Sequence, residues 1–148
     1  MRSAMKRTIL AGLFLVVLLG AACSGDIDRC PKCGMNVDMS PRWTAGLTLD
    51  DGSELRFCSP RCLFAWLHRE QAEGTVWVTE YYSQERMPAA DLLFVVGSDV
   101  VGPMGSALVP VNGVDAAERF RYDHEGDKVV RMPEITLELL QSLKKRSE

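Results

Sequence analysis

The chain has 148 residues, of which 47% are hydrophobic and 25% are charged, a composition typical of one globular domain and not of a disordered protein. Its formal net charge is −3, and removal of Arg2, Lys6 and Arg7 with a predicted leader leaves 14 basic against 20 acidic residues, a net of −6. Because an acidic surface repels phosphate backbones, these values argue against nucleic acid as a partner.

Residues 1–22 are predicted to be an export signal, because a basic start precedes an apolar run at 9–19 that is too short to span a bilayer. Small residues at 20–22 then lead to Cys23, a pattern that resembles the bacterial lipobox, with Gly20 where Leu is usual. The resemblance implies lipidation of Cys23 and a domain anchored to a membrane, facing the periplasm or the cell exterior. A plain signal peptide cut near the same point and an uncleaved anchor are the alternatives, and both also place the domain outside the cytoplasm.

A short tether is predicted at residues 23–29, and the folded domain is predicted to span residues 30–146. Its first half, about residues 30–88, has the pattern of a ββαβ unit. Strands are predicted at 43–49 and 53–57, because alternating apolar segments flank an Asp-Gly turn there.

The helix of this half is predicted to begin at Ser59, which suits an N-cap, and Pro60, which suits the first helical position. An apolar stripe at i, i+3 and i+4 continues it until it fades at Glu70, with Gly74 beyond its end. The β-branched and aromatic run at 75–82 is predicted to be the closing strand.

The second half, about residues 89–132, repeats the ββαβ pattern without repeating the sequence. A capping box of Asp115 and Glu118 predicts a helix to about Asp123, with Gly126 in the left-handed C-terminal position. Three strands are predicted, at 92–96, 107–111 and 128–132.

Pro133 and Glu134 are predicted to open a terminal helix that ends in the basic residues at 144–146, as the helix dipole favours. The sequence therefore predicts an α+β fold, in which two ββαβ units in tandem and a C-terminal helix follow an N-terminal signal segment.

Four cysteines besides Cys23 form two pairs that 24 residues separate, Cys30 with Cys33 and Cys58 with Cys62. A CxxC loop points both sulfur atoms into one small volume, and a second pair across the hairpin could complete a four-sulfur shell. Because Cys58 and Cys62 flank the predicted helix start, we expect unpaired N–H groups to lower the pKa of both thiols. Four exported thiols are commonly two disulfides, so a stapled domain is the alternative.

Two methionines favour copper(I) among the candidate metals. Met35 follows the first pair in Cys-Gly-Met, and Met104 lies in a Gly-Pro-Met-Gly stretch typical of a tight turn. Thiolate and thioether are the ligands of soft copper(I), whereas zinc rarely takes methionine. Ordinary apolar packing is the alternative role for both methionines.

Five motifs stand in a characteristic order along the chain. They are Cys-Pro-Lys-Cys-Gly-Met at 30–35, the Asp-Gly hairpin at 51–52, Val-Thr-Glu-Tyr-Tyr-Ser at 78–83, the Gly-Ser to Gly-Pro-Met-Gly stretch at 97–105 and Val-Pro at 109–110. These motifs resemble those of the NosL family, and the resemblance covers nearly all of the mature chain. His-Glu-Gly at 124–126 is similar to that family's His-Gly-Gly stretch, with Glu125 as a departure.

The resemblance implies a lipoprotein of two ββαβ halves that binds copper(I) and serves the maturation of nitrous oxide reductase, alongside a membrane transporter complex. Carried over position by position, it implies Cys33, Met35 and Met104 as copper ligands, with His124 as a weaker addition. His68 matches no family residue and is expected at the surface. An enzymatic role is not implied, and no catalytic triad, phosphate-binding loop or paired-carboxylate pattern stands out in the sequence.

The pair Cys58 and Cys62 departs from the usual family pattern. Together with Cys30 and Cys33 it resembles the TRASH-type arrangement of metal-binding cysteines. A second metal site, a four-thiolate zinc site and a disulfide between Cys58 and Cys62 are all open. Other functions that the cysteines permit are a zinc-binding module and a thiol–disulfide oxidoreductase using the CxxC motif, although the thioredoxin-like βαβ context is missing around that motif.

Overall fold

The computed structural model describes residues 27–145 of the chain. The predicted signal at 1–22, the predicted lipidation of Cys23 and most of the predicted tether lie outside the described residues. None of the helices between residues 27 and 145 combines the length and the hydropathy that crossing a bilayer requires.

The first half forms a four-stranded antiparallel sheet in the order β2-β1-β3-β4. The predicted turn joins β1 to β2, with Gly52 at φ +82° and the carboxylate of Asp51 accepting the N–H of Ser53. Two short 3-10 helices, Val37–Met39 and Pro41–Trp43, precede the sheet. The elements of this half are then β1 (Ala45–Thr48), β2 (Glu54–Phe57), helix α1 (Pro60–Glu70), β3 (Thr75–Thr79) and β4 (Arg86–Pro88).

The second half forms a three-stranded antiparallel sheet in the order β6-β5-β7. Successive residues of its central strand point to opposite faces, so Phe94 and Val96 enter one core while Val95 enters another beneath a helix. The elements are β5 (Leu93–Gly102), β6 (Gly105–Val111), helix α2 (Val114–Asp123), β7 (Lys128–Arg131), a 3-10 turn (Met132–Glu134) and helix α3 (Leu137–Lys145).

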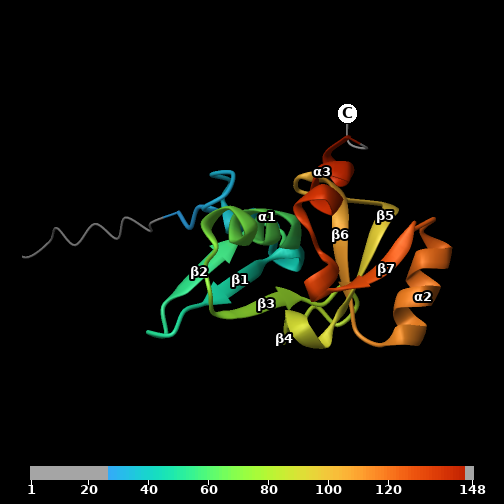
Figure 1. The fold of residues 1–148 in the computed structure, drawn as a ribbon, viewed down its shortest axis with the longest axis horizontal. Helices are drawn as coiled ribbons and strands as arrows, with labels where there is room; N and C mark the ends of the chain where they lie inside the picture. The colour runs from blue at the N-terminus through green and yellow to red at the C-terminus, as the bar shows by residue number, and fades with distance from the viewer. Residues whose placement is uncertain (1–26, 146–148) are drawn as a thin grey trace, which may run out of the picture.

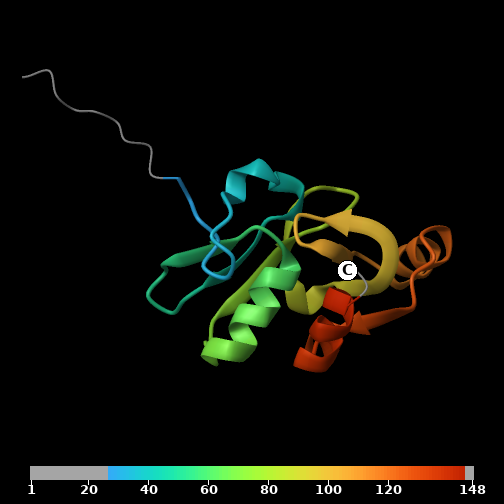
Figure 2. The ribbon, with the colours of Figure 1, turned by 90° about the horizontal axis from the view of Figure 1, so that it is seen from above.

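The two sheets lie side by side, and α1 and α3 lie next to each other where the halves meet (Figures 1 and 2). Helix α2 packs on the other face of the second sheet, against β5 and β7 (Figure 1). One hydrophobic core runs through both halves, so they are held in a fixed arrangement. Its fully buried side chains include Phe57, Leu63, Phe94, Leu108 and Leu143.

A buried carboxylate also joins the halves. Glu80, which follows β3 and is only 3% exposed, accepts the N–H groups of Tyr82 and Ser83 at 2.9 and 2.6 Å and that of Asn112 at 3.2 Å. Asn112 directly follows β6, and the N–H of Tyr81 donates to Pro110 in the same strand at 2.9 Å. Strand β6 is therefore tied at its C-terminal end to the segment that follows β3.

The predicted α+β fold with two ββαβ units and a terminal helix is confirmed, and the first unit carries the extra strand β4. Two predictions about α2 are wrong. The helix begins after Gly113, so Asp115 lies inside the first turn instead of capping it. Glu125, at φ +52°, takes the left-handed position predicted for Gly126. Gly126 is required for space instead, because an added Cβ would lie 2.8 Å from Cγ1 of Val95.

Other element boundaries also differ. Helix α3 begins at Leu137 and not at Pro133, because the chain first makes a 3-10 turn and Thr136 then accepts the N–H of Leu139 at 3.2 Å. Strand β3 ends at Thr79, three residues earlier than predicted, because Glu80 draws the following N–H groups into a turn.

Candidate metal centre

Cys30 and Cys33 lie on a tight loop ahead of the first sheet, at residues 29–36, which we call the cysteine loop. The N–H of Cys30 donates to the carbonyl oxygen of Met35, and the N–H of Gly34 donates to that of Cys30, both at 2.8 Å. Gly34 has φ +78°, a conformation that L side chains rarely adopt. This glycine therefore turns the chain back directly after Cys33.

The cysteine loop is attached to β2. Arg56 of that strand pairs with Asp28 at 2.7 Å and with Asp38 at 3.1 Å, on either side of the loop. These partly exposed ion pairs contribute little energy by themselves. Val37 anchors the loop, because its side chain is fully buried in the main core. Its N–H also donates to the backbone carbonyl oxygen of Asp28 at 2.9 Å. The loop is thereby held over the end of β2, where the second cysteine pair begins.

Cys58 directly follows β2, and Cys62 occupies the third position of α1. Ser59 caps the helix as predicted, because its Oγ accepts the N–H of Cys62 at 3.2 Å while Pro60 takes the first helical position. The sharp change from strand to capped helix places both sulfur atoms on the side of the cysteine loop. Cys58 and Cys62 are 0% and 3% exposed.

The four sulfur atoms form a single group, which we call the cysteine cluster. All lie within 4.8 Å of one another, with 3.5 Å between Cys33 and Cys58 and 3.6 Å between Cys58 and Cys62. A tetrahedral ion with metal–sulfur bonds of about 2.3 Å would set its sulfur ligands about 3.8 Å apart. Cys30 is buried like the second pair, whereas Cys33 is exposed. The cluster is therefore closed on the protein side and open at Cys33.

The pKa values of the three buried thiols are shifted in different directions. Hydrogen bonds from Cys58 and then Cys62 lower the pKa of Cys30, which makes its thiolate the most stable in the cluster. Donation to that thiolate raises the pKa of Cys58 to about 12, and the same interaction with Cys30, followed by Cys58 and burial, raises the pKa of Cys62. The negative charge is thus held at Cys30, and a cation among the sulfur atoms would favour deprotonation of Cys58 and Cys62.

These shifts correct the expectation that the start of α1 lowers the pKa of Cys58 and Cys62. The N–H of Cys62 is already used by Ser59, so it is not free to stabilise a thiolate. Interaction with the Cys30 thiolate, and after it burial, instead raises the pKa of both Cys58 and Cys62.

Met104 lies at the turn between β5 and β6 and faces the same groove as two residues of the cysteine cluster. Its 37% exposed side chain lines a groove of about 710 Å³ together with Cys33 and Cys62. The groove runs between the cysteine loop, α1, α3 and the β5–β6 turn, which we call the Met104 turn. Its other lining residues are Lys32, Arg61, Ala65, Arg69, Leu137, Leu140 and Gln141.

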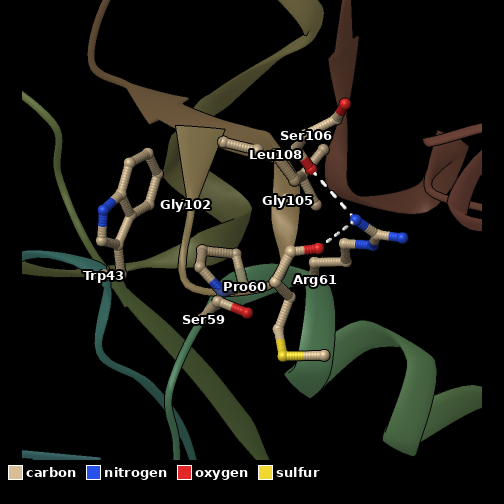
Figure 3. Close-up of a pocket in the computed structure, with 10 residues that line it drawn as sticks. Trp43, Ser59, Pro60, Arg61, Gly102, Gly105, Ser106 and Leu108 are labelled. Carbon is tan, nitrogen blue, oxygen red and sulfur yellow. Dashed lines mark hydrogen bonds between the residues drawn. The ribbon is translucent and has the colours of Figure 1, made fainter. Parts of the chain in front are cut away.

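Arg61 holds the Met104 turn against α1. Its Nη1 donates to the carbonyl oxygens of Met104 at 2.6 Å and Ser106 at 3.3 Å, as the dashed lines of Figure 3 show. Burial lowers the pKa of Arg61. Sequence reasoning missed this residue, although its place between Cys58 and Cys62 was visible. The contact spans 43 residues, and nothing in the local pattern indicates it.

The other predicted ligands lie elsewhere. Met35 packs against the main core and is not among the residues that line the groove. His124 ends α2, where its Nδ1 lies 3.0 Å from a carboxylate oxygen of Asp99 and its ring stacks near Phe120, and it does not belong to the metal-ligand group found within residues 27–145. The structure therefore gathers the four cysteines and places Met104 on the groove that Cys33 and Cys62 also line, while a ligand role for each stays a prediction.

His68, expected at the surface, is instead partly buried, and its Nε2 lies 2.6 Å from the carbonyl oxygen of Ile135. This contact links α1 to the segment before α3. His68 thus has a structural partner on the opposite end of α1 from the cysteine cluster.

The cysteines of the described chain are all free thiols, so the disulfide-stapled alternative has no support in this structure. The setting of the CxxC motif also differs from that of a thioredoxin-like oxidoreductase. Cys30 and Cys33 precede the first strand on a loop, and no helix begins at either of them.

The chain is similar to known proteins both in sequence and in structure. A family model described as NosL matches residues 24–140. Among solved structures, the chain is similar to the copper chaperone NosL from Shewanella denitrificans, with a TM-score of 0.66 and 26% sequence identity, over 74% of this chain and 90% of that chain. None of the curated proteins matches the chain.

Proposed function

The chain belongs to the NosL family, and from this membership we propose that it is a copper(I)-binding lipoprotein that acts outside the cytoplasm and delivers copper to apo nitrous oxide reductase. The observation that carries copper binding is a cluster of four cysteine sulfurs within 4.8 Å that opens through Cys33 into a groove also lined by Met104. The client, its membrane transporter complex and the anchor at Cys23 rest on the family resemblance and on the leader sequence.

Copper is the cargo of this protein, so the site has to hold it and let it go by ligand exchange. Thiolate and thioether sulfur suit the soft monovalent ion. Cys33 is exposed, so ligands of an acceptor displace it first, while the neighbouring thioether of Met104 keeps a sulfur on the ion. The buried sulfurs of Cys30, Cys58 and Cys62 are displaced last. The ion stays monovalent throughout, so no oxidant or reductant takes part.

Zinc binding at the cysteine cluster is the second candidate function. The sulfur spacing near that of a tetrahedral four-thiolate shell favours it, because structural zinc sites are closed and commonly use four cysteines. Such a site would not need Met104. The two functions therefore differ in whether the thioether of the β5–β6 turn contacts the metal.

The decisive experiment is metal binding to the reduced mature protein, residues 23–148, under anaerobic conditions. We expect copper(I), buffered with bicinchoninate, to displace zinc, and X-ray absorption of the copper form to contain only sulfur neighbours. Met104→Leu should remove one of these neighbours, whereas Met39→Leu, at a 76% exposed methionine outside the groove, should change nothing. Zinc that persists against excess buffered copper(I) would establish the zinc module instead.

The cellular part of the proposal is tested separately. Mass spectrometry of the protein isolated from membranes should find a lipid-modified N-terminus at Cys23, and Cys23→Ser should abolish membrane association. Copper-loaded protein should then activate purified apo nitrous oxide reductase. Activation by the copper–bicinchoninate complex at the same rate, without this protein, would argue against delivery.

A further inference from the structure

The groove beside the cysteine cluster is basic in an otherwise acidic protein. The chain has a net charge of −3, yet Lys32, Arg61 and Arg69 line the groove and no Asp or Glu does. Arg61 donates to two neutral carbonyl oxygens, so its charge is not neutralised. Within residues 27–145, Arg69 is the one of these three cations that has a carboxylate partner, Glu70, at the surface. The groove therefore concentrates positive charge at the opening of the metal centre.

The floor of the groove is apolar. Leu137 at the start of α3 is 46% exposed, and Ala65 and Leu140 also line the groove. Exposed apolar surface rimmed by charge is typical of a protein contact, with an apolar centre that excludes water and a rim that selects the partner by charge. A partner for this surface needs an apolar side chain flanked by carboxylates.

The position of the groove next to the cysteine cluster suits a partner that takes up copper from the cluster. Cys33 and Cys62 form part of its wall, so a segment bound there touches the exposed sulfur of the cluster. Charge complementarity and access to the sulfur thus coincide at one surface.

We propose that the groove between α1, α3 and the Met104 turn is the docking site for an acidic segment of the copper acceptor protein. Its carboxylates pair with Lys32, Arg61 and Arg69 while an apolar side chain covers Leu137. Docking in this way brings the acceptor's own metal ligands next to Cys33. This proposal rests on the proposed copper delivery, but docking is measured apart from it.

The test uses the mature protein and a fluorescent peptide of alternating glutamate, leucine and norleucine. The peptide has no sulfur, so its binding reports docking and not metal exchange. We expect fluorescence anisotropy to show binding that weakens with added salt. A matched peptide with lysine in place of glutamate should not bind.

Charge reversal locates the contact. The double variant Lys32→Glu, Arg69→Glu should weaken binding of the acidic peptide about tenfold or more, because two attractive rim charges become repulsive. The control Arg119→Glu, Lys128→Glu makes the same change in net charge at exposed positions of α2 and β7, outside the groove. Its affinity should stay within about twofold of the wild type, since it alters only distant charge.

A second pair of variants tests the apolar floor. Leu137→Gln should weaken binding of the peptide, whereas Val114→Gln, at a 60% exposed apolar residue that starts α2, should not. Circular dichroism checks that both pairs keep the fold, and bicinchoninate competition measures the copper(I) affinity of every variant. If the peptide binds but the protein does not bind copper(I), the delivery function is refuted while the docking surface is supported.

Three results would overturn the docking proposal. One is equal affinity for the glutamate and lysine peptides. Another is wild-type affinity in the Lys32→Glu, Arg69→Glu protein. The third is that vesicles of phosphatidylglycerol bind through Lys32 and Arg69 while the acidic peptide does not, which would assign the groove to a lipid surface.

Discussion

Nη1 of Arg61 lies 2.6 Å from the carbonyl oxygen of Met104, although 43 positions of the sequence separate the two residues. Arg61 stands next to Cys62 at the start of α1, and Met104 lies at the turn of the other half. The hydrogen bond therefore holds the thioether-bearing turn beside the thiols. Cysteines alone can complete a zinc shell, so under the proposed function this contact should matter for copper(I) and not for zinc.

We predict that Arg61→Ala lowers the copper(I) affinity about 10-fold to 100-fold, the range found when a residue that orients a metal ligand is removed. The zinc affinity should stay nearly unchanged, because the four cysteines do not depend on this contact. Parallel competition titrations with bicinchoninate for copper(I) and a chromophoric chelator for zinc measure both values.

Arg61→Lys should recover part of the copper affinity, since an ammonium group can still donate to one carbonyl oxygen. Arg121→Ala serves as the control, because Arg121 forms an exposed ion pair with Glu118 on α2. An equal loss of copper and zinc affinity in Arg61→Ala would mean that Arg61 supports the fold and not Met104.

The buried and exposed cysteines should differ in their effect on stability. Cys58→Ser places a hydroxyl at a fully buried position, and we expect the metal-free protein to lose about 1–3 kcal/mol in its free energy of unfolding. Cys33→Ser, at the exposed position, should change that free energy by about 0.5 kcal/mol at most. Urea unfolding under reducing conditions with a chelator gives both values, and equal losses would contradict the assigned burial.

Metal affinity should rise with pH. In the metal-free cluster the pKa of Cys58 is raised to about 12 by interaction with the Cys30 thiolate, and the pKa of Cys62 is also raised. Both thiols therefore hold their protons at neutral pH, and a bound metal has to displace them. From pH 8 to pH 6 the affinity should fall about tenfold per pH unit for each displaced proton.

Calorimetry in buffers of different ionisation enthalpy counts these protons directly. Release of a proton from each of Cys58 and Cys62 is expected at pH 7. Cys30 should contribute little, because hydrogen bonds from the other two thiols lower its pKa. Metal binding without proton release would show that the buried thiols are not ligands.

Gly34→Ala tests the shape of the cysteine loop. The added methyl group would meet no atom within 4 Å, so the cost comes only from the backbone at φ +78° and should be about 1–2 kcal/mol. Because the strain is borne by the loop itself, affinity for copper(I) and zinc should fall together. Gly52→Ala, at φ +82° with equally open surroundings, is the matched control far from the metal centre and should reduce stability alone.

Local signals in the sequence were sufficient for most of the fold and for the cysteine cluster. The Asp51 turn and the Ser59 cap each depend on residues within a few positions, and both were predicted correctly. A hairpin followed at once by a capped helix necessarily returns Cys58 and Cys62 toward the start of the domain. Short-range chemistry therefore predicted where the sulfur atoms would gather.

The parts that sequence reasoning missed depend on contacts between distant segments. Gly126 is conformationally ordinary and is needed for space against Val95, which the helix-end pattern could not reveal. The pKa order of the thiols follows from burial and from which sulfur atoms face one another, so the helix start alone gave the wrong direction. Arg61 was overlooked because its partners lie in the other half of the chain.

Strand β6 is fastened at both of its ends, by Arg61 at Ser106 and by Glu80 at Asn112. These contacts hold the turn that carries Met104 against α1, so we expect that the proposed exchange of the ion does not require the two halves to separate. Under the proposed function, exchange of the ion would then need only small movements of side chains at the opening of the metal centre, while the backbone keeps its position.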